Sequence, residues 1–200
     1  MNMIMEEAAV RVATPADEDA IIATLVLAFS SDPAARWAFP DPAGYLEHFP
    51  EFVRLFGGKA FEHGSAYFVG GYAGGALWLP PGTEPDQERL EALLERAVPA
   101  HLREDLSAVF DMMGRHHPSE PHWYLPLVGV DSCQQGRGYG SALLRHALWI
   151  CDRDRKAAYL ESTNTRNIPL YERHGFELVG TIQVGSSPPI FPMLRRSARF

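Results

Sequence analysis

The feature that most constrains this 200-residue chain is a glycine-rich turn between an apolar segment and an amphipathic one. Residues 123–130 form an apolar run typical of a buried strand, and residues 140–151 place apolar side chains three or four apart, as in a helix packed on one face. Between them stand Gly136, Gly138 and Gly140. Because glycine lacks Cβ and adopts positive φ, successive backbone N–H groups there can point into one concavity at a helix N-terminus. The turn therefore predicts a phosphate site.

Two common phosphate motifs do not fit this turn. A dinucleotide fingerprint has the spacing G-x-G-x-x-G with an acidic residue roughly 20 positions later, and a P-loop has G-x-x-x-x-G-K-[ST]. Neither spacing is present. The segment from Gln135 to Gly140 instead resembles the Q/R-x-x-G-x-G/A signature of the GCN5-related N-acetyltransferase (GNAT) superfamily, in which backbone amides hold the pyrophosphate of coenzyme A.

A second segment, residues 161–176 (ESTNTRNIPLYERHGF), looks like another marker of that superfamily. In it Asn164 is followed seven residues later by Tyr171, and then by a glutamate and a Gly-Phe pair. The two markers stand in the superfamily's order at about its usual separation. Within the superfamily, residues 121–125, 160–163 and 166–173 look most like puromycin-type and other small-molecule acetyltransferases.

The resemblance implies an α/β, single-domain GNAT fold over residues 1–200, with a central mixed and mostly antiparallel sheet flanked by helices. Two amphipathic stretches between Thr83 and Gly114 predict an extra helical pair inserted before the cofactor-binding strand. The other patterns predict a strand at 10–12, a helix ending before Ser30, a helix at 43–62 with a break near Pro50, a hairpin of 66–69 and 76–79, a strand at 157–160, a short helix at 167–174, and closing strands at 176–184 and 190–194.

The resemblance also implies a mechanism, direct transfer of acetyl from acetyl-CoA to an amine in a ternary complex. Backbone groups of residues 128–130 would pair with the pantetheine arm and polarise the thioester carbonyl. Tyr171 matches the family's general acid, which protonates the departing thiolate. Asn164 and Asn167 match positions that cap the following helix and hydrogen-bond the cofactor, and for Asn167 the capping role is equally good. The cofactor-binding residues implied are Val128, Gly129, Val130, Gln135, Gly136, Arg137, Gly138, Tyr139, Gly140, Ser141, Asn164 and Asn167.

The general base is less clearly marked. The strand 123–130 carries no carboxylate, whereas some family members place a glutamate there. Glu161, at the end of the strand 157–160, is the best replacement, because such strand ends meet the cleft. Glu161 could equally be a solvated or hydrogen-bonded strand-end residue. A water chain, or an acceptor already deprotonated in solution, also remains open.

Three functions compete. The first is N-acetylation of a small-molecule amine, the second acetylation of a protein or peptide amine, and the third non-catalytic binding of acyl-CoA. The presence of Tyr171 disfavours the third, and the helical pair at 83–114 favours a covered pocket over a peptide groove. The aromatic residues indicate an acceptor with an apolar or aromatic body, with Trp37, Phe39, Tyr45, Trp78 and Trp123 as candidates to contact it.

The composition and charge of the chain restrict its partners and its cellular compartment. The formal charge is -7, which disfavours nucleic acid and anionic membranes as partners. Two cysteines, Cys133 and Cys151, and the acidic Glu6 and Glu7 in place of a signal peptide favour a cytoplasmic protein. No metal is expected, since His116, His117 and His122 lack a recognised metal-ligand spacing. The basic C-terminus, with Arg195, Arg196 and Arg199, reads as an exposed tail rather than a contact to coenzyme A. A homodimer is compatible with the sequence.

Overall fold

The strands of the computed structural model, which describes residues 9–198, form one seven-stranded sheet. Its order is β1-β2-β3-β4-β5-β7-β6, and all neighbours are antiparallel except β4 and β5. The strands are β1 (Val10–Val12), β2 (Ala66–Val69), β3 (Gly74–Leu79), β4 (His122–Val130), β5 (Ala157–Ser162), β6 (Glu177–Leu178) and β7 (Phe191–Arg195). This is the mixed, mostly antiparallel sheet that the sequence predicted. Glu6, Glu7 and Arg199 lie outside the described residues.

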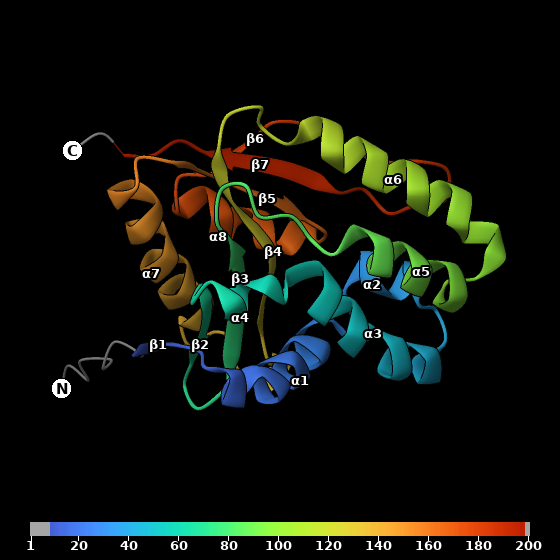
Figure 1. Cartoon of the computed structure of the whole chain (residues 1–200), viewed down its shortest axis with the longest axis horizontal. Coiled ribbons are helices and arrows are strands. Elements are labelled where there is room, and N and C mark those ends of the chain that lie inside the picture. The colour runs from blue at the N-terminus through green and yellow to red at the C-terminus, as the bar shows by residue number, and fades with distance from the viewer. Residues whose placement is uncertain (1–8, 199–200) are drawn as a thin grey trace.

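Helices cover both faces of the sheet (Figure 1). Helices α1–α6 pack on one face around one hydrophobic cluster, while α7 and α8 pack on the other face. The helices are α1 (Glu18–Phe29), α2 (Pro33–Ala38), α3 (Pro42–Gly57), α4 (Lys59–Glu62), α5 (Gln87–Ala97), α6 (Arg103–His116), α7 (Tyr139–Arg153) and α8 (Ile168–Arg173), with 3-10 turns at Pro15–Asp17, Ala100–Leu102, Ser132–Gln134 and Thr165–Asn167. The predicted helical pair is thus α5 and α6, although α6 continues past Gly114.

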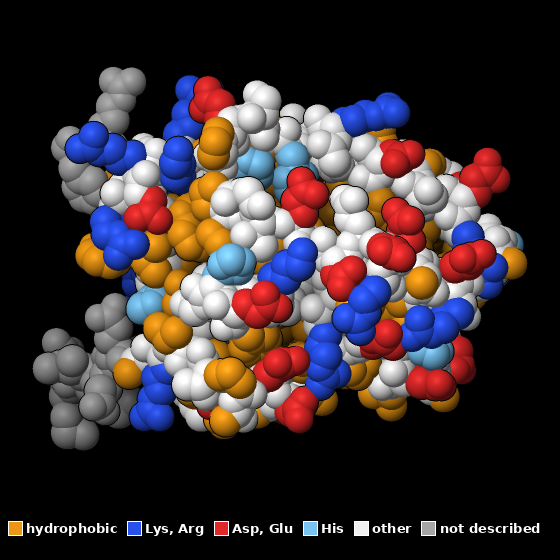
Figure 2. All heavy atoms as spheres, in the orientation of Figure 1, with side chains coloured by type: hydrophobic (Ala, Val, Ile, Leu, Met, Phe, Trp, Pro, Cys, Tyr) orange, Lys and Arg blue, Asp and Glu red, His pale blue; other side chains and the backbone are white. Residues whose placement is uncertain are grey.

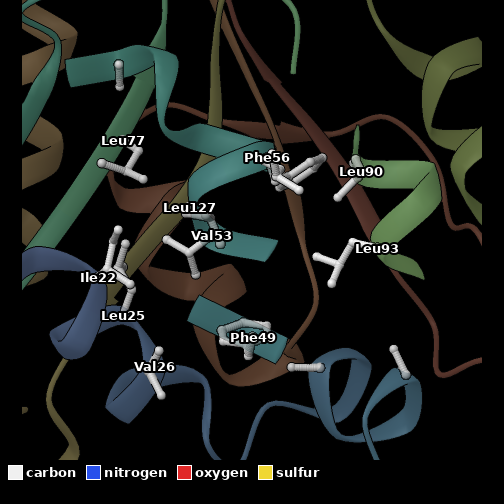
Figure 3. Close-up of a cluster of buried hydrophobic side chains, with 14 of the residues drawn as sticks. Ile22, Leu25, Val26, Phe49, Val53, Phe56, Leu77, Leu90, Leu93 and Leu127 are labelled. Atoms are coloured by element: carbon white, nitrogen blue, oxygen red, sulfur yellow. The ribbon is translucent and has the colours of Figure 1, made fainter. Parts of the chain in front are cut away.

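The larger cluster joins α1, α3 and α5 to the middle of the sheet (Figure 3). Leu25 and Phe49 are fully buried there, and each such side chain contributes about 1.5–3 kcal/mol on burial. Helix α1 approaches the backbone of β4 closely at Gly129. A Cβ atom at Gly129 would lie 2.5 Å from Cβ of Ala28, so only glycine fits under α1. This packing places the C-terminal end of α1 beside the carboxyl end of β4.

The structure differs from the prediction in three elements. Helix α3 runs through Pro50 without the expected break. Proline removes one N–H, and the carbonyl that loses its partner belongs to Leu46, a residue that is 64% exposed and lies on the water-facing side of the helix. Helix α2 was not predicted, because Ser30 to Pro33 was interpreted only as the end of the preceding helix. The closing strand predicted at 176–184 is reduced to β6 and one bridge, Ile182 to Ile190.

The sheet opens between its two central strands. Strands β4 and β5 pair only at His122–Ala157, Trp123–Ala158 and Tyr124–Tyr159. Beyond that point β4 continues to Val130 along β3 alone, so one of its edges is left unpaired. Pro126 lies in this unpaired part and has no N–H to give to a ladder, which suits the separation. The two strands therefore separate beyond Tyr124 and Tyr159 and leave a V-shaped cleft between them.

The surface is mixed in charge. Figure 2 shows acidic and basic side chains interspersed over the face on which α3, α5 and α6 lie, without a continuous basic stripe on that face. Within residues 9–198, no helix combines the length and apolar character that crossing a bilayer would need.

Candidate active site

A cleft of about 480 Å³ lies at the opening of the sheet, between the end of β4 and the start of α8. Its floor is the glycine turn that begins α7. Gly136 and Gly138 have φ of +77° and +81°, and Gly138 is the N-cap residue of α7. A Cβ atom at Gly138 would meet nothing within 4 Å, so the backbone angle rather than crowding requires glycine there. The unpaired N–H groups of the first turn of α7 are then available to an anion.

The cleft brings together nearly all the residues predicted to hold the cofactor. Those lining it are Val128, Gly129, Val130, Gln135, Gly136, Gly138, Tyr139, Gly140, Ser141, Asn164 and Asn167, with Tyr171 beside them. Arg137 is exposed and is not part of the lining. Two arginines that the sequence analysis did not single out, Arg166 and Arg173, do line the cleft and add positive charge where a diphosphate would lie.

The two asparagines divide the roles differently from the prediction. The side chain of Asn164 accepts a hydrogen bond from the backbone N–H of Arg166 at 3.0 Å and so caps the turn before α8. Asn167 occupies the N-cap position of α8 but makes no capping hydrogen bond through its side chain. The capping role proposed for both asparagines is thus present at Asn164 and absent at Asn167, which is exposed and lines the cleft.

Tyr171 is buried on α8, with its ring edge-on to Phe176 at 6.1 Å. It lines the large cleft and also a smaller cavity of about 40 Å³ between β4 and β5. Burial raises the pKa of the phenol well above its usual value, and the nearby charge of Asp32 raises it further. The hydroxyl is thus protonated at neutral pH, as a proton donor must be.

Asp32 is the main site residue that sequence reasoning missed. It is the N-cap of α2, where one carboxylate oxygen accepts hydrogen bonds from the amides of Ala34 and Ala35. The other oxygen accepts a hydrogen bond from the hydroxyl of Thr163 at 2.6 Å. Burial raises the pKa of Asp32. Because this carboxylate lines both the cleft and an apolar cavity, it stands where the two meet.

The apolar cavity, of about 100 Å³, lies on the face covered by α1–α6. Its walls are largely aromatic and include Phe29, Trp37, Phe39, Phe49, Phe52, Phe56 and Phe110. The inserted helices supply Leu94, Leu106 and Met113. Of the aromatics proposed to contact an acceptor, Trp37 and Phe39 are here. Tyr45, Trp78 and Trp123 are buried elsewhere in the core, so that part of the prediction is wrong.

Glu161 lines the small cavity between the strands, together with Tyr171 and Thr163. Its side chain is only 3% exposed, which excludes the solvated strand-end interpretation. Its Oε1 atom lies 3.3 Å from Nε2 of His117, which follows the end of α6. The carboxylate is therefore enclosed, on the opposite side of the V from the glycine turn.

Comparison with known proteins decides the family. The Acetyltransferase (GNAT) domain family matches residues 104–178. An uncharacterized N-acetyltransferase of Schizosaccharomyces pombe is 31% identical over 174 residues, which cover 77% of this chain and 68% of that protein. The chain belongs to the GNAT acetyltransferases. Two of the solved structures that share its fold show the range of sequence identity. The structure of "histone acetyltransferase HPA2 and related acetyltransferase" from Corynebacterium glutamicum is 30% identical to this chain, with a TM-score of 0.68, and the match covers 96% of this chain and 97% of that one. Arylalkylamine N-acetyltransferase 2 from Aedes aegypti is 13% identical, with a TM-score of 0.65, and the match covers 96% of this chain and 99% of that one.

The basic C-terminus of this GNAT acetyltransferase is not an exposed tail at Arg195. That guanidinium makes two hydrogen bonds to the carboxylate of Asp152, at 2.8 and 2.7 Å, and joins β7 to the end of α7. Cys151 is buried, and burial raises the pKa of its thiol to about 12, whereas Cys133 is exposed in the turn before α7. Within residues 9–198, no group of three or more His, Cys, Asp or Glu side chains is placed to hold a metal ion.

Proposed function

We propose that this GNAT acetyltransferase moves acetyl from acetyl-CoA directly to the amine of a small molecule with an apolar body. The observation that carries the proposal is the junction at Asp32, where a cavity of aromatic and aliphatic side chains meets the cleft that carries the superfamily's cofactor markers. Burial raises the pKa of Asp32 because it disfavours the charged carboxylate, and a cation placed beside the carboxylate would stabilise that charged form. A small molecule with an ammonium group and an apolar body would place the ammonium beside Asp32 and the apolar body in the cavity.

The cleft has the features that the acetyl donor needs. Its glycine turn offers backbone N–H groups to the diphosphate, and the free edge of β4 at residues 125–130 offers an unpaired ladder to the pantetheine arm. The donor supplies the acetyl thioester. Val128 and Val130 line the cleft, and their backbone groups would polarise its carbonyl.

Three side chains of the protein would bind the ammonium and transfer its protons. Asp32 binds the ammonium, and Glu161 is our proposal for the group that takes its proton. The free amine attacks the thioester carbon, the carbon–sulfur bond breaks, and Tyr171 gives its proton to the leaving sulfur. The nitrogen loses its second proton to the tyrosinate, which restores Tyr171. One net proton is released for each ammonium acetylated.

A protein or peptide acceptor is the main alternative. The names of the relatives cover both classes, a histone and an arylalkylamine, and do not decide between them. What favours the small molecule is that α5 and α6 close over the cavity. The loop 184–187 adds to this cover, since the backbone N–H of Ser186 donates to Asp105 at 2.9 Å and Trp37 donates to its hydroxyl at 3.2 Å.

The test is a thiol-release assay with acetyl-CoA against arylalkylamines, puromycin, aminoglycosides, polyamines and histone peptides. We expect amines with an apolar body to be acetylated best, and Asp32→Asn to raise their KM. Asp41→Asn is the matched control, since Asp41 is also an Asp-Pro helix cap but is exposed and lines neither pocket. Acetylation confined to histone peptides, with Asp32→Asn no different from Asp41→Asn, would overturn the proposal.

A further inference from the structure

The loop 184–187 forms the tip of a hairpin that lies along α6. The hairpin is closed at its base by the bridge between Ile182 and Ile190, and both side chains form one buried cluster with Val109 of α6. Asp105 lies one helical turn before Val109, so both residues face the same side of α6. Apolar packing therefore holds the base of the hairpin to α6, and Asp105 is placed to meet its tip.

Polar contacts at the tip join three elements that are far apart in the sequence. The backbone N–H and the hydroxyl of Ser186 both donate to Oδ2 of Asp105, at 2.9 and 3.0 Å. The hydroxyl oxygen in turn accepts a hydrogen bond from Nε1 of Trp37, on α2, at 3.2 Å. A hydroxyl donates one hydrogen and can accept at the same time, so all three contacts can be made together. Gly185 packs so closely on the carboxylate that a Cβ atom there would overlap both oxygens of Asp105.

These contacts act on the apolar cavity through Trp37. The indole is one wall of that cavity, and Val109 and Ile190 are others, whereas neither Asp105 nor Ser186 lines it. Trp37 is partly exposed, and such a side chain can change its rotamer unless a contact fixes it. The hydrogen bond to Ser186 is that contact. The position of this wall therefore depends on a carboxylate outside the cavity.

We propose that Asp105 is a specificity-determining residue, which holds Trp37 in place through Ser186 and so limits the apolar body of the acceptor to about one ring. The cavity measures about 100 Å³, and an apolar cavity of roughly 150 Å³ holds one benzene molecule, so a single ring already fills the space. A second fused ring needs Trp37 to move. The specificity rests on the function proposed above, whereas the positioning of Trp37 does not.

The first experiment measures the position of Trp37 without any substrate. The ¹H–¹⁵N signal of its indole N–H, assigned with Trp37→Phe, should move in Asp105→Ala, which removes the acceptor of both hydrogen bonds from Ser186. Asp105→Asn keeps a carbonyl oxygen there and should keep the wild-type signal. Asp111→Ala is the matched control, since Asp111 is exposed on the same helix. An unchanged indole signal in Asp105→Ala would overturn the proposal.

The second experiment measures selectivity with phenethylamine and naphthylethylamine, whose bodies are one ring and two fused rings. We expect the wild type to favour the one-ring amine in kcat/KM by about tenfold or more, because an apolar pocket discriminates by that factor against a body that does not fit. Asp105→Ala should bring the ratio toward one, and Asp105→Asn should restore it. The ratio does not depend on the fraction of folded enzyme, so a general loss of stability would leave it unchanged.

Gly185→Ala tests the same contact from the loop. The added Cβ would displace the loop from Asp105 without altering any residue that lines the cavity, so the ratio should fall as in Asp105→Ala. Gly64→Ala is the matched control, since Gly64 has a φ of +63°, close to the +51° of Gly185, but its Cβ would meet nothing within 4 Å.

The outcomes separate this role of Asp105 from the function itself. A wild-type preference for the two-ring amine, or a wild-type ratio in either Asp105→Ala or Gly185→Ala, would refute the specificity and leave the proposed function standing. If the wild type acetylates neither these two amines nor any other, the proposed function fails and the specificity with it. The indole signal then still decides whether Asp105 positions Trp37.

Discussion

The cleft and the apolar cavity meet at Asp32 but are built in different ways. The cleft is lined by the glycine turn, by the starts of α7 and α8 and by the end of β4, and most of its lining falls within residues 128–173. The cavity is made mostly of side chains from α1, α2, α3, α5 and α6, and strand β4, Thr163 and the segment before β7 complete it. A site built from backbone requires particular residues at particular spacings, whereas many combinations of side chains can enclose an apolar space.

The largest expected effect is at Tyr171, which lines both the cleft and the cavity between the strands. Tyr171→Phe should lower kcat by about 10²- to 10⁴-fold, because the general acid is lost while the ring still packs on Phe176. Affinity for CoA should change little. Steady-state kinetics and a CoA titration measure both. Tyr45→Phe, which removes another buried hydroxyl away from the cleft, is expected to keep its kcat. More than about a third of wild-type turnover in Tyr171→Phe, with chemistry rate-limiting, would end the assignment.

The backbone-built cleft can be broken at one glycine. Gly138→Asp places a negative charge in the anion site and a side chain at positive φ. At a CoA concentration of about 100 Kd, the wild type should gain about 2.7 kcal/mol, and the variant should gain none. Thermal melting with and without CoA measures this. Gly82→Asp is the matched control, since Gly82 has the same φ of +81° in open space away from the cleft. Equal stabilisation of Gly138→Asp and Gly82→Asp by CoA would contradict the site.

A substitution in the apolar cavity should change KM for the amine and leave CoA binding unchanged. Phe110→Ala removes an aromatic wall supplied by α6, and it is expected to raise KM for amines with an apolar body by roughly tenfold, about 1.4 kcal/mol. Stabilisation by CoA should stay as in the wild type. Phe61→Ala serves as the control, because Phe61 is a half-buried aromatic outside the cavity. If Phe110→Ala weakened CoA as much as the amine, the two sites would not be separable.

The smallest effect distinguishes two carboxylates by the pH dependence of folding. Burial raises the pKa of Asp32, so its contribution to stability is present below the unfolded pKa and is lost as pH rises through the folded pKa. The hydrogen bonds from Arg195 lower the pKa of Asp152, so its contribution is present above the unfolded pKa and is lost as pH falls through the folded one. Denaturation of Asp32→Asn and Asp152→Asn across the acid range should therefore deviate from wild type with opposite slopes. Parallel slopes would contradict both assignments.

The cleft could be predicted from the sequence, whereas the apolar cavity could not. The strand, turn and helix around Gly138 and the helix carrying Tyr171 were predicted because local spacing records backbone geometry. Asp32 was missed, although Asp followed by Pro is a helix-start signal, because its burial depends on Thr163, 131 positions away. The pairing of His117 with Glu161 likewise depends on how α6 lies over β5. Most of the lining of the cleft was thus predictable from local sequence, while the lining of the apolar cavity required the tertiary structure.

The short junction between β4 and β5 has a consequence for protein engineering. Residues 10–130 and 157–195 each form a contiguous half of the sheet, and the two halves are hydrogen-bonded across three residue pairs. The turn between them, at Asp154 and Arg155, is exposed. A chain cut there would leave the glycine turn and α7 on one fragment and Asn164 with Tyr171 on the other. Neither fragment alone would hold a complete cleft, so recovered acetyl transfer would report that the two fragments had come together.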